Sequence, residues 1–187
     1  DLWKISQLKE IMEKHKFKQI RFIEWIKTNP QPLNSKTNYL TNCREIALLG
    51  VKGGKPTFNS KYDNGIYNYP LQGGKNRFHP TQKSLPLFED IIKKHSNEGD
   101  VVLDTFLGGG TTAFACKKTN RNFKGCDVSK EYYDKVMKIV NKYIDKMPII
   151  VYVLEENTGH NGWNGHRIYG AYPYLMNTDF ITYLDED

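Results

Sequence analysis

The chain of 187 residues contains little cysteine, no long apolar run and no signal-peptide pattern. Its cysteines, Cys43, Cys116 and Cys126, are odd in number and lack CxxC spacing, which argues against a disulfide framework and a structural zinc site. No segment is long and apolar enough to cross a bilayer. Because aromatic residues make up 13% of the chain, disorder is also a poor interpretation. The sequence therefore predicts a folded cytoplasmic or otherwise intracellular protein without membrane association.

The positive charge of the chain is unevenly distributed. The net charge is +6 in total, with +7 in residues 1–100, +4 in residues 101–148 and −5 in residues 149–187, which contain no lysine. Lysine and arginine side chains that neutralise phosphates provide most of the sequence-independent affinity for nucleic acids. The basic part therefore favours a polyanionic partner, although many proteins that bind no nucleic acid also have lysine-rich surfaces.

Apolar periodicity divides the chain into short alternating elements. It predicts helices at 4–18, 85–95, 112–118 and 130–146, and strands at 20–26, 45–51, 100–104 and 123–127. Segments 30–42 and 55–78 are rich in Asn, Gly, Pro and Tyr, and we expect them to be loops. Composition and charge change together near Met147, which predicts a boundary between domains at 1–148 and 149–187. The second part is predicted to contain a strand at 149–154 and a helical stretch at 167–175.

The most informative segment is a strand that ends in an acid and enters a helix through three glycines. Residues 101–112 read VVLDTFLGGGTT, so Asp104 ends the strand and Gly108–Gly110 precede the helix, which Thr111 or Thr112 can cap. Asp127 ends the next predicted strand, where an acid can hold two ribose hydroxyls. GxGxxG and GxxxxGK[ST] are both absent, which disfavours a dinucleotide site and a P-loop. The sequence predicts a nucleotide-type site, with a glycine turn that binds nothing as the alternative.

Five motifs resemble those of the DNA N6-adenine/N4-cytosine methyltransferases, in that family's order. Asp104–Thr112 resembles the DPF-x-GSGTT cofactor motif, and His79–Ser84 (HPTQKS) resembles HPTxKP. Gly125–Asp127 with Glu131–Tyr133 resembles GIE…EYY, Trp25–Pro30 resembles W-x-K-x-NP, and Arg44–Ile46 resembles the strand after it. The order is that of the permuted β-type members, and the resemblance covers about residues 1–146. Thr105 and Ser84 stand where the family motifs have prolines.

The resemblance implies an α/β fold with a Rossmann-like sheet for S-adenosylmethionine, helices on both faces, and a short α/β tail. It assigns cofactor contacts to Asp104, Phe106, Gly108, Gly110, Thr111, Asp127, Thr81, Lys83 and His79. Asp127 would take the ribose hydroxyls, and Thr81 and Lys83 would close the methionine end. Double-stranded DNA is the implied partner, and a bacterial or viral restriction–modification system is the implied context.

Target recognition is expected in the loops within residues 31–78. Side chains that could contact DNA phosphates are Asn29, Lys36, Arg44, Lys52, Lys55, Lys61, Lys75 and Arg77. The target base, the recognition sequence and the oligomeric state do not follow from the sequence.

The family's [DSN]PP[YFW] catalytic motif has no counterpart, because the chain contains no Pro-Pro pair. In the permuted order this motif and its strand precede Trp25, so we expect the chain to begin partway through a longer protein. The absent strand would lie beside residues 101–104, and its loss would leave the sheet incomplete with open edges. We expect the chain alone to bind cofactor poorly and to methylate nothing.

The acidic tail resembles the start of a GT-A nucleotide-sugar glycosyltransferase. Its last predicted strand ends in Asp185-Glu186-Asp187, and carboxylates in an Asp-x-Asp arrangement can hold a divalent cation against a diphosphate. Solvated carboxylates at a chain end are the alternative, and the tail strands could instead fill the vacant position in the sheet. Three functions follow: a DNA amino-methyltransferase, a glycosyltransferase fusion, and an inactive remnant that only holds DNA.

Overall fold

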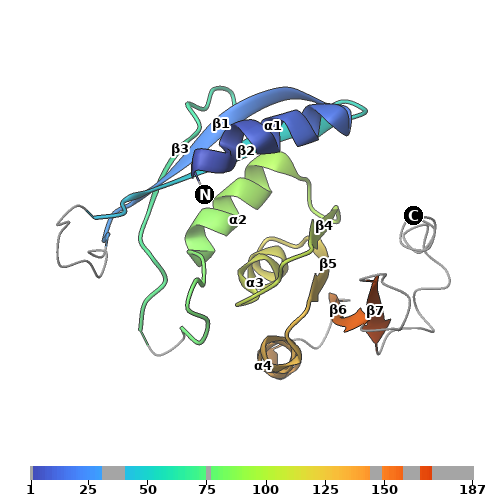
Figure 1. The fold of residues 1–187 in the computed structure, drawn as a ribbon. Coiled ribbons are helices and arrows are strands. Elements are labelled where there is room, and N and C mark those ends of the chain that lie inside the picture. Colours follow the sequence, from blue (N-terminus) through green and yellow to red (C-terminus); the bar gives the residue numbers. More distant parts are fainter. Residues whose placement is uncertain (1, 31–40, 75–76, 144–148, 158–164, 170–187) are drawn as a thin grey trace. The chain divides into compact units, whose positions relative to one another are not determined.

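The computed structural model describes residues 2–30, 41–74, 77–143, 149–157 and 165–169. The chain forms two compact units, one of residues 1–76 with 83–97 and one of residues 77–82 with 98–187 (Figure 1). We call them the first unit and the second unit. Among the described residues, no helix has the length and apolar character needed to span a membrane.

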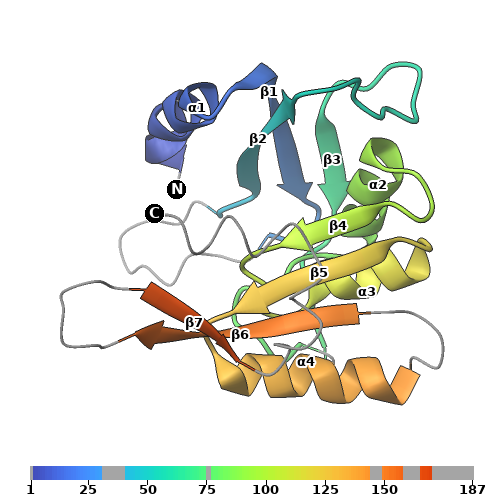
Figure 2. The same cartoon turned by 90° about the vertical axis from the view of Figure 1, so that its right-hand side faces the viewer.

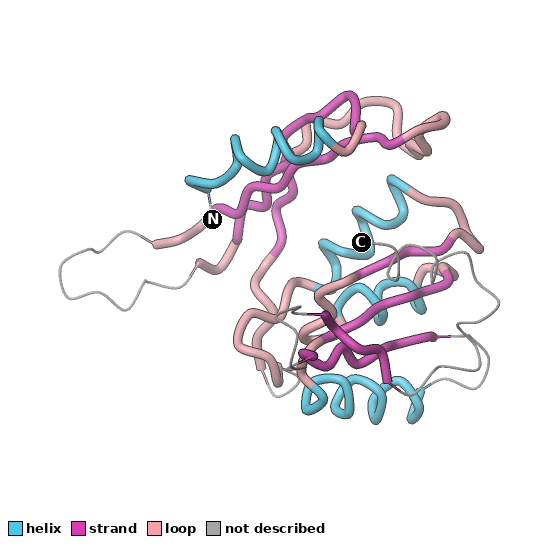
Figure 3. Tube along the Cα trace, turned by 45° about the vertical axis from the view of Figure 1, so that its right-hand side comes forward, coloured by secondary structure: helices cyan, strands magenta, loops and turns pink. Residues whose placement is uncertain are grey.

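The first unit contains a three-stranded sheet with the strand order β2-β1-β3. Strand β1 (Phe17–Lys27) pairs antiparallel with β2 (Arg44–Lys52) and parallel with β3 (Ile66–Tyr69). A short 3-10 turn (Leu2–Lys4) leads into helix α1 (Ile5–Lys14), which runs along β1 and β2, as Figure 3 shows. Helix α2 (Leu85–His95) packs near β3.

The core of the first unit lies between α2 and the sheet. Trp25, Tyr67 and Leu87 are buried together, and the indole of Trp25 donates a hydrogen bond to the carbonyl of Tyr69 over 2.8 Å. Tyr69 donates through its hydroxyl to Asp90 on α2 over 2.9 Å. These contacts explain strand β3, which we expected to be part of a loop. Its alternating tyrosines are a period-two signal that the surrounding Gly and Asn residues obscure.

The second unit contains a four-stranded sheet with the order β4-β5-β6-β7 (Figure 2). Strands β4 (Val101–Asp104), β5 (Asn122–Asp127) and β6 (Ile149–Asn157) are parallel, and β7 (Gly165–Tyr169) pairs antiparallel with β6. Helix α3 (Thr111–Lys118) connects β4 to β5, and helix α4 (Lys130–Tyr143) connects β5 to β6. This architecture confirms the predicted α/β class with a parallel sheet.

Both crossover helices of the second unit lie on the same side of β4 and β5 in Figure 1. Successive right-handed crossovers that advance in one direction place their helices on one face of a sheet. Helices on the second face, which the family resemblance implies, stay a prediction, because none belongs to the described residues of this unit.

Strand β4 lies at the edge of the described sheet. Its apolar side chains Val101 and Leu103, which share one face of the strand, are 58% and 49% exposed. The tail does not fill this position, since β6 pairs with β5 on the side of the sheet away from β4. That alternative for the tail is therefore wrong for the described residues.

The prediction of a helix at 167–175 is also wrong for residues 167–169, the part of it that the structure describes. Residues 165–169 form β7, whose backbone pairs with β6 from Gly165 opposite Asn157 to Tyr169 opposite Val153. The free edge of β6 supplies hydrogen bonds that outweigh a weak local helix preference. Residues 170–187 lie outside the described residues, and so does the rest of this expected helix. The domain boundary near residue 148 stays a prediction.

Candidate functional site

The candidate site forms where the parallel strands β4 and β5 end side by side in the second unit. Asp104 lies opposite Gly125 in the strand pairing, and Asp127 follows two residues later on β5. The carboxyl ends of parallel strands are where open α/β sheets bind their ligands. The loop between β4 and α3, residues 105–110, lies between the two acids, and we call it the glycine loop.

The carboxylate of Asp104 holds both ends of the glycine loop. One oxygen accepts the backbone N–H of Phe106 over 3.0 Å, and the other accepts the hydroxyl of Thr112 over 2.5 Å. The motif comparison named Thr111 and did not single out Thr112, which makes this contact with Asp104. The available signal was a second hydroxyl, two residues after the last glycine.

Helix α3 begins without a side-chain cap. Its N-cap residue is Gly110, in the left-handed conformation with φ of 71°, and both threonines lie within the helix. The expected cap by Thr111 or Thr112 is therefore wrong. Thr111 is buried, only 6% exposed. A backbone that enters a helix through a left-handed residue leaves no place for a capping hydroxyl and favours glycine.

The carboxylate of Asp127 binds the middle of the same loop. Its oxygens accept the N–H groups of Gly108 over 2.6 Å and of Ser129 over 2.8 Å. A carboxylate offers about four lone-pair positions, so these two bonds leave capacity for further donors. The loop is anchored to β5 a second time, because Leu107 donates its N–H to the carbonyl of Cys126 over 3.0 Å.

The electrostatics around Cys126 reflect the convergence of the two acids. Burial raises the pKa of its thiol, and the negative charges of Asp104 and Asp127 raise it further. Burial likewise raises the pKa of Cys116, on α3, to about 12. Both cysteines are therefore neutral thiols at physiological pH, and neither is a nucleophile of the site.

The HPTQ segment packs against the glycine loop. A side chain added at Gly109 would stand 2.9 Å from Gln82 and 3.2 Å from His79, and the His79 ring is 3.4 Å from the corresponding position at Gly108. The His79 ring also lies 4.3 Å from the ring of Tyr132, measured between centroids. Residues of three sequence motifs, HPTQ, the glycine loop and EYY, thus meet in the second unit.

Among the other predicted cofactor residues, His79 and Thr81 contact each other, whereas Phe106 is exposed. The ring nitrogen Nδ1 of His79 accepts the N–H of Thr81 over 3.2 Å and lies 3.2 Å from its hydroxyl. Phe106 has few contacts, with 89% of its surface exposed. An aromatic ring that is exposed beside two carboxylates and a row of glycines fits an adenine or another flat group.

Lys83 belongs to the first unit and is already paired. Its ammonium lies 2.5 Å from Glu45, which also holds the buried Lys27 over 3.0 Å. Both lysines lie over the ring of Trp25, at 5.8 and 5.4 Å. Burial alone would raise the pKa of Glu45, but hydrogen bonds from Lys83 and Lys27 outweigh it, and the pKa is lowered. The cofactor contact expected of Lys83 stays a prediction.

The residues predicted to contact DNA are dispersed. Arg44 and Lys52 are exposed at the two ends of β2, Lys55 and Lys61 are exposed in the loop that follows, and Lys36 and Lys75 lie outside the described residues. The side-chain oxygen of Asn29 accepts the N–H of Leu71 over 2.6 Å, a bond that orders the first unit.

Arg77, in the second unit, donates to the carbonyls of His79 and Pro80. The described residues contain no cluster of His, Cys, Asp and Glu able to hold a metal ion. Asp185 and Asp187 lie outside them, so the predicted cation site stays untested.

Comparison with known proteins agrees with this geometry. The profile of the N6/N4 methylase family, described as DNA methylase, matches residues 3–138. The chain is 35% identical over 158 residues to the Type II methyltransferase M2.DpnII of Streptococcus pneumoniae, covering 72% of this chain and 54% of that protein. It is 54% identical over 56 residues to the Type II methyltransferase M.HpaI of Haemophilus parainfluenzae, covering 30% and 18%. The chain spans about half the length of the curated relatives that match most of it.

Solved structures show the same fold. The crystal structure of the M1.HpyAVI–SAM complex is 38% identical, with a TM-score of 0.65, over 75% of this chain and 71% of that one. The cytosine-N4-specific PvuII DNA methyltransferase, at 14% identity and a TM-score of 0.58, shares the fold over 80% of this chain and 66% of its own. Because the family profile covers well over half of the sequence, the chain belongs to the N6/N4 DNA methylase family.

Proposed function

We propose that the protein is a site-specific DNA methyltransferase, or a part of one, that uses S-adenosylmethionine to methylate N6 of adenine or N4 of cytosine. The observation that carries the proposal is the attachment of one glycine loop to two strand-end carboxylates, Asp104 and Asp127. The relatives named Type II methyltransferases and the SAM complex of a similar structure support the same activity.

The residues of the site fit this cofactor. Gly110 is buried against Val136 of α4, where a side chain would stand 2.8 Å away, so a glycine lets the loop pack closely on this helix. The remaining lone pairs of Asp127 suit ribose hydroxyls, and the exposed ring of Phe106 suits the adenine. The cofactor supplies the methyl group, while the protein supplies binding and alignment.

Asp104 serves this site as a positioning residue. It fixes Phe106 at the start of the loop and Thr112 at its end, so the loop amides keep their positions before a ligand arrives. Backbone amides near a helix start also favour the carboxylate of the cofactor's amino-acid part. A loop that is held in place before the ligand binds reduces the free-energy cost of ordering it on binding.

The proposal is tested by titrating S-adenosylhomocysteine into the protein in a calorimeter. We expect saturable binding that Asp127→Ala weakens at least tenfold, because the loss of one charge-assisted hydrogen bond costs about 1.5–3 kcal/mol. Asp134→Ala is the matched control, since Asp134 is an exposed acid on α4 whose ion pair among the described residues is with Lys130. Equal affinities of wild type and Asp127→Ala would overturn the assignment of the pocket.

The transfer itself is measured with radiolabelled S-adenosylmethionine and mixed-sequence duplex DNA. Digestion of the product to nucleosides identifies methylated adenine or cytosine, and this measurement decides the target base. Label in neither nucleoside, with the cofactor bound, would agree with the absence of a Pro-Pro motif and would restrict the chain alone to cofactor binding.

A further inference from the structure

A basic cavity opens on the first unit, away from the cofactor residues. Its volume is about 490 Å³, and it lies where the start of β1, the end of β2 and the C-terminal end of α2 meet the loop after β2. The polar side chains that line it are Gln19, Arg21, Lys52, Lys55, Thr57 and His95. No carboxylate lines this cavity.

The three permanent cations of this cavity are available for a ligand. Arg21, Lys52 and Lys55 are exposed, and no ion pair within the described part of the chain involves them. The guanidinium of Arg21 donates to the carbonyl of Ile20 over 3.0 Å, and the ammonium of Lys52 lies 5.6 Å from the centre of the Phe17 ring. These contacts hold the two head groups near the sheet without neutralising them.

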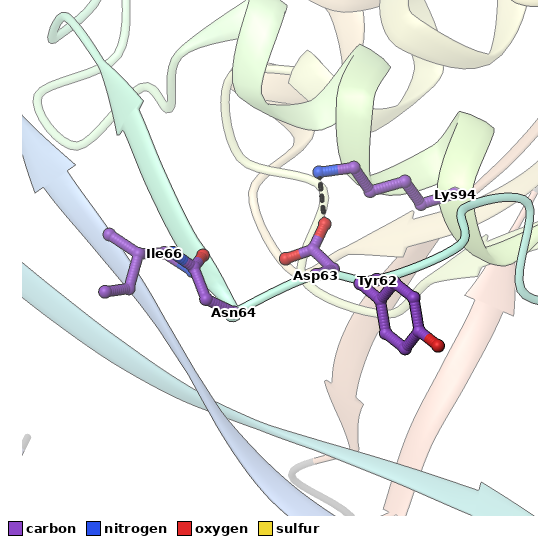
Figure 4. A pocket seen from close by; sticks show the side chains of 5 residues that line it. All are labelled: Tyr62, Asp63, Asn64, Ile66 and Lys94. Atoms are coloured by element: carbon purple, nitrogen blue, oxygen red, sulfur yellow. Dashed lines mark hydrogen bonds and ion pairs between the residues drawn. The ribbon is translucent and has the colours of Figure 1, made fainter.

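Two acids of the first unit, Asp63 and Asp90, are paired with a lysine that does not line the cavity. Figure 4 shows Lys94 directed at Asp63 in a neighbouring pocket. Its ammonium lies 2.6 Å from Asp63 and 3.2 Å from Asp90. Because one cation binds both carboxylates, they repel an anion at His95 and the cavity only weakly.

The hydrogen bonding of the carbonyls at the C-terminal end of α2 also favours an anion. Free carbonyls at a helix C-terminus disfavour negative charge. Here Asn59 donates hydrogen bonds to these carbonyls. Its backbone N–H donates to the carbonyl of Lys94 over 2.8 Å, and its side-chain amide donates to the carbonyls of Lys93 and Ser96 over 3.0 and 2.8 Å. These three carbonyls are therefore already bonded and do not face an anion as free acceptors.

The backbone shape leaves room for a large ligand. Strand β1 has an irregularity between Lys18 and Arg21 that shifts its register against β2. In the turn after β2, no atom lies within 4 Å of a side chain added at Gly53 or Gly54. An open glycine turn beside fixed cations lets a rigid, extended ligand approach the backbone.

We propose that this cavity binds the sugar–phosphate backbone of duplex DNA, with Arg21, Lys52 and Lys55 as phosphate contacts and Gln19 and Thr57 as neutral donors. Such contacts fix the register of a protein on DNA without reading the sequence. The inference rests on the proposed function, which supplies duplex DNA as the substrate. It groups Lys52 and Lys55, which the sequence analysis named as separate candidate phosphate contacts, with Arg21 in one site.

The test measures the affinity of the full chain for a fluorescent duplex by anisotropy at several salt concentrations between about 50 and 200 mM. The slope of log K against log salt is negative, and each phosphate contact that is lost reduces its magnitude by about 1. We expect the variant R21Q/K52Q/K55Q to reduce the magnitude of the slope by about 2–3. The variant R21K/K52R/K55R, which keeps the charges, is expected to keep the wild-type slope.

The matched control is K4Q/K93Q/K138Q, which removes three exposed positive charges outside the cavity. A control variant that reduces the magnitude of the slope as much as R21Q/K52Q/K55Q would overturn the inference, because the effect would then follow from net charge. Absence of duplex binding by the wild type would overturn it too. Circular dichroism and urea midpoints of the variants establish that all of them are folded.

Titration of the same variants with S-adenosylhomocysteine separates this inference from the proposed function. If R21Q/K52Q/K55Q keeps the wild-type slope while the cofactor product still binds, the cavity is not a DNA site and the methyltransferase proposal stands. If the product does not bind to the wild type but the magnitude of the slope falls in the cavity variant, the phosphate site stands and the methyltransferase proposal fails.

Discussion

At the scale of single residues, Gly110 combines two constraints that are separable by mutation. It has φ of 71°, and an added side chain would stand 2.8 and 2.9 Å from the two methyl groups of Val136. Gly99 has φ of 86° with nothing within 4 Å of such a side chain. The two positions share the backbone strain but differ in the steric clash.

We therefore expect Gly110→Ala to destabilise the protein more than Gly99→Ala. The left-handed conformation costs an alanine about 1–2 kcal/mol at either position. Overpacking against Val136 adds about 1–3 kcal/mol at Gly110 alone. Urea unfolding of both variants measures the difference. Equal losses would show that Val136 moves aside and that the close approach imposes no constraint.

At the scale of elements, the pairing of Glu45 with Lys27 and Lys83 joins β1, β2 and the segment before α2. The Lys27 side chain is only 7% exposed, so its charge depends on Glu45 as a partner. Removal of a partner from a buried donor costs about 1–3 kcal/mol, more if the donor is charged. By contrast, the Lys9–Glu13 pair on α1 is half exposed on both sides.

We expect Glu45→Gln to lower the free energy of unfolding by about 1–3 kcal/mol at neutral pH. Glu13→Gln is the control, with an expected loss of about 0.5 kcal/mol or less. Since the folded-state pKa of Glu45 is lowered below its ordinary 4.5, the stabilisation is complete above pH 4.5 and is lost as the pH falls through the folded pKa. Urea midpoints between neutral and acidic pH measure this.

The difference between wild type and Glu45→Gln should accordingly narrow as the solution becomes acidic. A difference that stays constant below pH 4.5 would indicate that the amide changes packing and that the charge of Glu45 is unimportant.

At the scale of the whole molecule, the two proposed ligands bind to different units. The cofactor residues other than Lys83 belong to the second unit, whereas the basic cavity belongs to the first. A ligand that binds only the folded state slows the local opening of the backbone that it contacts.

Hydrogen–deuterium exchange should therefore respond differently to the two ligands. We expect S-adenosylhomocysteine to slow exchange in residues 104–112 and 127–129, and duplex DNA to slow it in residues 19–21 and 52–57. Measurement by mass spectrometry on the same chain compares them. Protection of residues 19–21 and 52–57 by S-adenosylhomocysteine alone would contradict the division of roles.

Much of the second unit could be predicted from the sequence because its signals are local. A strand, an acid, glycines and a helix follow one another within residues 101–118, and the predicted limits of α3 agree with the structure to within one residue. The exact partner of Asp104 could not be predicted, because Thr111 and Thr112 differ only in the rotation of the helix that carries them.

The sequence by itself determined the family, the α/β class and the pair of acids around the glycine loop. These features depend on neighbouring residues, whose backbone preferences are local. Only the tertiary structure decided the parallel pairing of β3 with β1, the contact of Lys83 with Glu45 and the grouping of Arg21 with Lys52 and Lys55. Such contacts join residues far apart in the chain, and strand register and side-chain packing select them among many partners of equal local propensity.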